Sequence, residues 1–162
     1  MKRLLFISSR LEPNNKNGAY LASKRNFDNL SCIENLKIDK CIIKLDTKFH
    51  SKLLNIFFFN RLEGSTPYME KKILLTIKEN NYDFIFLDGS GFGYLAEKIK
   101  RIFPNIKIIV FCHDINYFLF STVLNEIKKT KKFLEIKKVL VMYKHIINSV
   151  INEKKYLEIL IK

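Results

Sequence analysis

Apolar residues in this chain gather in four short runs, each bounded by polar, Gly- or Pro-containing segments. Runs of this length between turn-forming residues are typical of strands that are buried on both faces of a sheet. The β-branched centre of the last run, Ile108 to Val110, favours a buried strand most strongly. The predicted strands are Leu4–Ile7, Lys40–Leu45, Phe84–Leu87 and Lys107–Cys112.

Between these runs, apolar positions advance by three and four residues, which is the spacing of one helix face. Ser65-Thr66-Pro67 predicts a helix start, because a hydroxyl caps the first turn and proline suits its first position. Pro104 ends another helix, and the pattern over 48–60 favours a helix over a loop. From about Phe120 to the C-terminus the pattern predicts helix, with a break near 128–132. The stripes are Tyr20, Ser23, Phe27 and Leu30; Met69, Ile73, Leu74 and Ile77; and Phe92, Leu95, Ala96, Ile99 and Ile102.

Strands that alternate with helices pair in parallel through right-handed crossovers. The predicted fold class is therefore α/β: a Rossmann-like, doubly wound and mainly parallel sheet of about four or more strands, with flanking helices and a helical C-terminal segment. A length of 162 residues fits one domain. Such sheets bind ligands at the carboxyl ends of their strands. Three loops follow predicted strands: Ser8–Gly18, Asp88–Gly93 and His113–Tyr117.

The first of these loops precedes a helix, so its backbone N–H groups could hold a phosphate or a sugar hydroxyl. Its candidate residues are Arg10, Asn17 and Gly18. The loop lacks the glycine patterns of dinucleotide and P-loop sites, which argues against both. An ordinary loop with a turn at Asn17-Gly18 is the alternative.

The second loop has alternate glycines at a strand-to-helix junction, and these would let a ligand approach the backbone closely at Gly89 and Ser90. Tight-turn packing is the alternative that the spacing favours.

The third loop carries the main chemical candidate, because His113 directly follows a strand and should emerge at the ligand edge. An imidazole there can bond a sugar hydroxyl or move a proton near neutral pH. A histidine that caps the next helix or bonds neighbouring backbone is the alternative. Cys112 is next to His113, but neighbours on an extended chain point to opposite sides, which argues against a cysteine hydrolase. The pattern indicates no metal site.

Several of these segments together match a known pattern: the start Arg3–Arg10 with Gly18, the strand opening Tyr82-Asp83, the turn at Pro104, and the strand end Phe111-Cys112-His113-Asp114 before Tyr117. This set resembles the N-terminal, acceptor-side domain of bacterial GT-B glycosyltransferases that assemble capsule and surface polysaccharides. The resemblance covers most of residues 1–117.

The resemblance implies transfer of a sugar from a nucleotide donor to a lipid-linked or saccharide acceptor. His113 would match the family histidine that faces the reacting sugar, and Asn17-Gly18 the glycine loop that approaches donor phosphate and acceptor. Arg10, Gly89, Ser90, Asp114 and Tyr117 would lie on the loops that face donor and acceptor. Asp114 and Asn116 stand where the family often has Asn and Glu, so the resemblance does not determine the identity of the acceptor.

A complete enzyme of this family has a second Rossmann-like domain that binds the nucleotide sugar. The expectation is that residues 1–162 form an incomplete N-terminal domain without the donor-binding domain, bind no cofactor themselves, and represent a truncated form, a split gene or a degenerate frame. The chain alone should then show no sugar transfer, and turnover at enzyme-like rates would refute this.

Twenty-nine Lys and Arg against sixteen Asp and Glu give a net charge of +13, which attracts polyanions. Three scattered cysteines and a short apolar N-terminus fit the cytoplasm. With lipid-linked acceptors, the expected charge partner is an anionic inner leaflet, tested by co-sedimentation with anionic against neutral liposomes. The main rival is a non-catalytic module that docks a partner through its basic C-terminal helices. Nucleic acid ranks third, because the aromatic residues fall on core stripes.

Overall fold

The structure is a computed structural model that describes residues 1–11, 17–43, 67–113 and 150–159. Strands and helices alternate along the chain. Residues 150–159 are also helical and are called the C-terminal helical segment below. The elements are β1 (Lys2–Ser8), α1 (Gly18–Ser31), β2 (Leu36–Ile42), α3 (Pro67–Asn80), β3 (Phe84–Asp88), the 3₁₀ turn η1 (Ser90–Phe92), α4 (Gly93–Ile102) and β4 (Lys107–Phe111).

The four described strands form one parallel sheet in the order β2-β1-β3-β4. After β1 the chain moves to one side to form β2, and it then returns across β1 to form β3 and β4. The direction of winding therefore reverses between β1 and β3. In open α/β sheets this switch point is where the loops separate and ligands bind.

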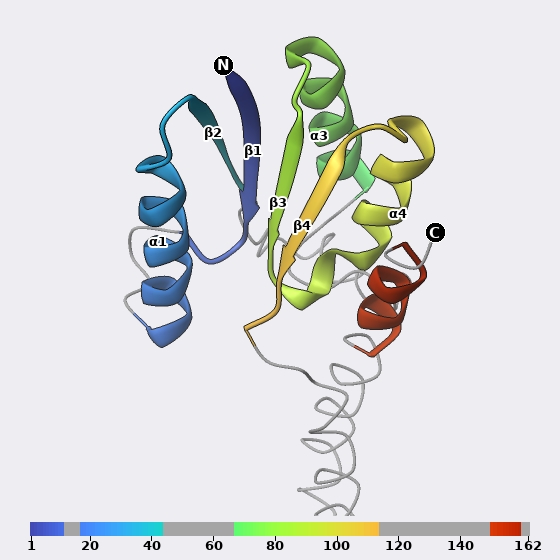
Figure 1. Ribbon diagram of the computed structural model, residues 1–162. Helices are drawn as coiled ribbons and strands as arrows, with labels where there is room; N and C mark the ends of the chain where they lie inside the picture. The colour runs from blue at the N-terminus through green and yellow to red at the C-terminus, as the bar shows by residue number, and fades with distance from the viewer. Residues whose placement is uncertain (12–16, 44–66, 114–149, 160–162) are drawn as a thin grey trace, which may run out of the picture.

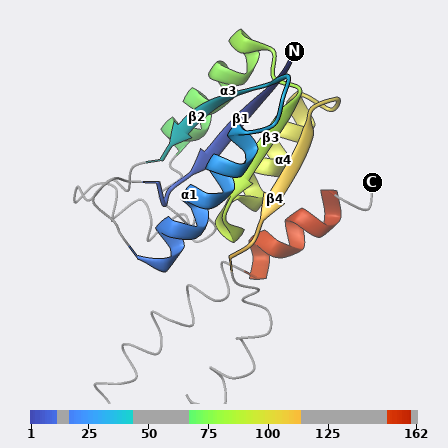
Figure 2. The same ribbon diagram turned by 60° about the vertical axis from the view of Figure 1, so that its left-hand side comes forward.

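Helices cover both faces of the sheet, as a doubly wound fold requires (Figure 1). Leu4 and Phe6 of β1 pack with Phe27 of α1 on one face, whereas Leu5 and Ile7 pack with the helices of the opposite face. Those helices are α3, α4 and the C-terminal helical segment, which Figure 2 shows on the far side of the sheet from α1. The predicted Rossmann-like α/β fold is confirmed.

Local chemistry explains where the helices begin. Asn17 precedes α1 with an extended backbone, and its side-chain Oδ1 accepts a hydrogen bond from the Tyr20 N–H at 2.9 Å. Pro67 is the first residue of α3, as predicted. In α4 the residues Leu95, Ala96 and Ile99 are buried, which confirms the predicted stripe at those positions.

The second strand lies earlier in the chain than predicted. The sequence predicted Lys40–Leu45, but β2 spans Leu36–Ile42, and the last two predicted residues lie outside the described ranges. β2 mixes the charged residues Lys37, Asp39 and Lys40 with apolar ones, because only part of each face is covered at the edge of the sheet. A search for continuous apolar runs detects the end of such a strand and misses its start.

The fourth strand is also less buried than predicted, since Ile109 is 40% exposed. In the described sheet β4 lies at the edge, beyond the strands that α1 covers, so its β-branched composition did not indicate full burial. The helix predicted over 48–60, the caps Ser65 and Thr66, and the helical pattern from Phe120 to residue 149 lie outside the described residues. None of the described helices has the length and apolar character needed to cross a bilayer.

Candidate functional site

Four polar side chains meet at the carboxyl ends of β1, β3 and β4. The Ser8 hydroxyl donates to Asp88 Oδ2 at 2.7 Å, and His113 Nε2 lies 3.1 Å from Asp88 Oδ1. Ser23 of α1 completes the group, with its Oγ 3.4 Å from the same ring nitrogen. Ser8, Ser23, Asp88 and His113 are called the rim cluster below. The cluster lies at the switch point of the sheet, on the α1 face.

The two-residue period of extended backbone places these side chains together. Along β1 the positions facing α1 are Leu4, Phe6 and then Ser8, and along β3 they are Phe84, Phe86 and then Asp88. The parallel register sets Ser8 opposite Asp88. The rim cluster is therefore the polar end of an apolar face, whose interior holds the stacked rings of Phe6 and Phe86 at 4.8 Å.

His113 reaches the cluster by the same alternation, two residues after Phe111, which ends β4 opposite Asp88. The rings of Phe111 and His113 meet edge to face with centroids 5.0 Å apart. The aromatic contact and the carboxylate together hold the imidazole plane.

Burial keeps water away from the rim cluster, so its members must satisfy one another's hydrogen bonds. Ser8, Ser23 and Asp88 are fully buried, and the His113 side chain is 7% exposed. With Asp88 ionised, its carboxylate can only accept hydrogen bonds, so Nε2 of His113 carries the proton in that contact. In the neutral ring, Nδ1 then carries the lone pair. The arrangement defines one basic nitrogen on a ring oriented by a carboxylate.

This geometry supports general base chemistry on a hydroxyl group, with the carboxylate stabilising the imidazolium that forms. It does not match a Ser-His-Asp relay, because Ser23 and Asp88 both contact Nε2, whereas the relay uses one ring nitrogen for each partner. Within the described ranges, no group of three or more His, Cys, Asp or Glu side chains could hold a metal ion.

The candidates of the first loop lie near this edge of the sheet in different roles. The Arg10 backbone N–H donates to Ser8 Oγ at 3.1 Å, so the loop start is tied directly to the rim cluster. Asn17 caps α1 through its side chain. Gly18 is the first residue of α1, and a Cβ built on it would meet no atom within 4 Å, so the backbone does not require glycine there.

The candidates of the second loop are buried. Gly89 has φ 148°, a backbone conformation that favours glycine, and Ser90 is 6% exposed. The Gly89 carbonyl accepts a hydrogen bond from the Tyr156 hydroxyl at 3.0 Å. These contacts fit the tight-packing alternative. Asp114 and Tyr117 lie outside the described residues.

The sequence interpretation missed three members of the rim cluster. Ser8 and Asp88 are the first residues of two candidate loops, but the sequence does not single out their side chains, and Ser23 counts only as one position of a helical stripe. The alternation of each strand, continued to its last residue, would have placed Ser8, Asp88 and His113 on one face. The partner strand and the register had to come from the structure.

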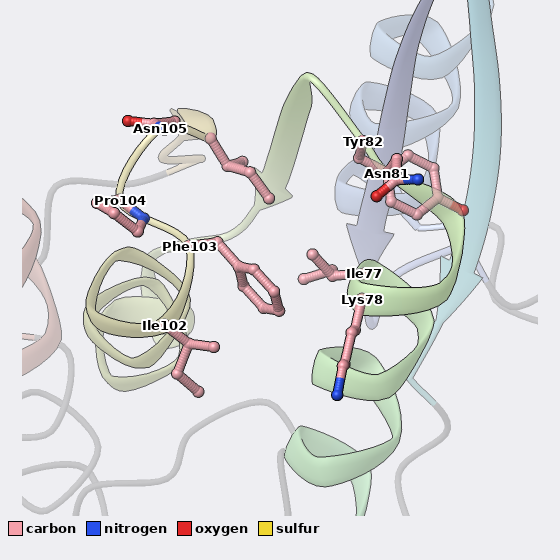
Figure 3. A pocket seen from close by; sticks show the side chains of 9 residues that line it. Ile77, Lys78, Asn81, Tyr82, Ile102, Phe103, Pro104 and Asn105 are labelled. Carbon is pink, nitrogen blue, oxygen red and sulfur yellow. The ribbon is translucent and has the colours of Figure 1, made fainter.

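A surface hollow of about 370 Å³ lies elsewhere, between the C-terminal ends of α3 and α4 (Figure 3). Tyr82 and Ile106, which line it, precede β3 and β4, so it lies at the amino ends of the strands. Figure 3 shows the side chains of Ile77, Ile102 and Phe103 around this hollow, with Lys78 at its side. It is distant from the rim cluster, and we assign the site to the carboxyl edge, where the buried acid-base pair lies.

The site is thus defined by position and by chemistry: a carboxylate-oriented imidazole at the switch point of a parallel sheet. No family model, no curated protein and no solved structure matches this chain.

Proposed function

We propose that this chain is the acceptor-side domain of a glycosyltransferase, in which a sugar acceptor binds at the carboxyl edge of the sheet, over the rim cluster, and His113 removes the proton from its attacking hydroxyl. One observation carries the proposal: the ring of His113 is held by buried Asp88 at 3.1 Å, at the edge where parallel α/β sheets bind ligands. The sequence resemblance around His113 supports the same assignment.

The chemistry requires a base for the acceptor hydroxyl and a group that stabilises the protonated form of that base. His113 supplies the base at Nδ1, and Asp88 stabilises the positive charge that develops on the ring. Ser8 holds the second oxygen of the carboxylate at 2.7 Å, so the acid is fixed from both sides. The ring can then take up and release a proton without changing its orientation.

A nucleotide sugar, bound by a second domain, would be the donor: the acceptor oxygen would bond to its anomeric carbon as the bond from that carbon to the phosphate breaks, and the nucleotide would leave. The acceptor would be lipid-linked or a free saccharide. The charge of +13 would favour an anionic membrane surface where lipid-linked acceptors lie. The rival role, docking of a partner through basic C-terminal helices, gains no specific support from residues 150–159. Asn152 and Tyr156 of that segment are buried against the sheet domain, and Lys155 pairs with Glu97.

Acceptor binding can be tested by NMR titration of the ¹⁵N-labelled chain with two probes: a panel of free disaccharides, and short-chain polyprenyl-pyrophosphate-linked sugars. We expect signals of His113 and Ser23 to shift with one probe class, and His113→Gln to weaken that binding at least about tenfold. Asp39→Asn is the matched control, because it alters a carboxylate of β2 that lies outside the rim cluster.

Two results would contradict the proposal. The first is equal binding by the wild type and His113→Gln. The second is that a nucleotide sugar, titrated as a third probe, shifts the His113 and Ser23 signals in preference to both acceptor probes, which would make this edge a donor site. Lipid-linked sugars and free disaccharides both present sugar hydroxyls to His113. Titrating the two classes separately shows which one the chain binds.

A further inference from the structure

The C-terminal helical segment holds the turn that follows Asp88. The hydroxyl of Tyr156 donates to the Gly89 carbonyl at 3.0 Å and accepts from the Phe92 N–H at 2.9 Å. Asn152 Oδ1 accepts from the Tyr94 N–H at 3.1 Å. Tyr156 is 5% exposed and Asn152 is fully buried, so these bonds are shielded from water.

This turn needs support, because its geometry is unusual. Gly89 adopts φ 148° and ψ 152°, outside the regions that other residues readily occupy, and the chain then passes through η1 into α4. The first N–H groups of a helix have no partner within the helix. Tyr156 and Asn152 supply partners at this junction from more than fifty residues further along the chain.

The contact between the two segments is also close. A Cβ built on Gly93 would lie 2.2 Å from the Asn152 carbonyl oxygen, so the backbones pack directly against each other. Lys155 adds an ion pair with Glu97 and lies 4.2 Å above the ring of Tyr94. The segment is therefore fixed against the junction at several points.

We propose that Tyr156 is a positioning residue for the Asp88–His113 pair. Its hydroxyl fixes the Gly89 carbonyl, the backbone that leaves Asp88 cannot rotate, and the carboxylate stays directed at Nε2 of His113. This keeps the proton on Nε2 and the lone pair on Nδ1. The role has chemical meaning only if the proposed function holds, but the coupling itself can be measured without any substrate.

The test compares Tyr156→Phe, which keeps the ring and removes the hydroxyl, with Tyr94→Phe at the same junction. The readout is the ¹⁵N and N–H signals of the His113 ring, identified by their loss in His113→Gln. We expect the wild type and Tyr94→Phe to show a protonated Nε2 that exchanges slowly. In Tyr156→Phe this proton should exchange about five to ten times faster, the size of effect that one lost hydrogen bond produces, and the ring should approach a mixture of tautomers.

Rescue separates positioning from general stability. 4-Aminophenylalanine at position 156 restores a donor to the Gly89 carbonyl, and it should restore slow exchange at Nε2. Unchanged ring signals in Tyr156→Phe would overturn the proposal. Equal acceleration of the backbone amides throughout β1 and β3 would also overturn it, because that indicates global opening. If the wild type binds no sugar in the titration above, the proposed function fails, whereas the effect of Tyr156 on the His113 ring can still be measured.

Discussion

The two ends of β1 and β3 carry polar clusters of opposite character. At the amino end, on the α3 face, Arg3 Nη2 lies 2.7 Å from Asp39 Oδ2, and the Tyr82 hydroxyl donates to the same oxygen at 2.8 Å. Opposite charges meet there, and both side chains are about 30% exposed. At the carboxyl end, the fully buried carboxylate of Asp88 is held by a hydroxyl and an imidazole.

The difference teaches how to separate a structural cluster from a functional one. Arg3 and Asp39 compensate each other's charge, so the amino-end cluster stabilises the fold. Burial raises the pKa of Asp39, but the hydrogen bonds from Arg3 and Tyr82 outweigh it, and the net pKa is lowered. A buried carboxylate with neutral partners costs free energy, and such a cost is common at sites that bind or react.

The largest expected effect concerns the packing behind the rim cluster. Gly93→Ala would place a methyl group against the backbone of Asn152, which cannot move aside as a side chain can. We expect a loss of about 3 kcal/mol in the free energy of unfolding, measured by urea denaturation. Gly18→Ala is the control, because its Cβ meets open space, and it should change stability by less than about 1 kcal/mol. Equal effects of the two variants would show that the segment 150–159 is not closely packed.

A second prediction uses alkaline pH to probe the amino-end cluster. Burial first, and then the hydrogen bond to Asp39, raises the pKa of Tyr82 from 10.0 to about 12. The folded state holds this proton more tightly than the unfolded state, so the contribution is complete below about pH 10 and is lost as pH rises through about 12.

Between these limits the wild type should lose about 2 kcal/mol more than Tyr82→Phe, which has no phenol to ionise. The measurement is urea unfolding of both proteins over this range of pH. Parallel pH profiles would mean that the phenol is solvated, and that the amino-end cluster is looser than its distances indicate.

The smallest expected effect compares the two clusters directly. Asp39→Asn removes the charge that Arg3 and Tyr82 share, and because the pair is partly exposed it should cost about 1 kcal/mol of unfolding free energy. Asp88→Asn removes a buried charge without a cation partner in the rim cluster, and an amide can still bond Ser8 and His113. It should leave stability within about 0.5 kcal/mol of the wild type, or increase it. A larger loss for Asp88→Asn than for Asp39→Asn would make the rim cluster a structural element.

Much of the fold could be predicted because its signals are local. The apolar runs at Leu4–Ile7 and Phe84–Leu87 predicted β1 and β3, and Pro67 predicted the start of α3. The start of β2 at Leu36 was missed because an edge strand mixes charged and apolar residues. His113 was a candidate because a polar residue directly after a buried strand emerges at the ligand edge. Asp88 opened a candidate loop, but its side chain was not singled out because the glycines after it favoured tight-turn packing, and Ser23 was counted only as part of a helical stripe.

The sequence by itself determined which segments become strands and helices, and that they alternate, since these properties depend on spacings of two to four residues. Only the tertiary structure decided which side chains meet. The register that sets Ser8 opposite Asp88, and the return of Tyr156 to Gly89, join residues 80 and 67 positions apart. Such contacts depend on how whole faces pack against one another, and no local pattern encodes the partner.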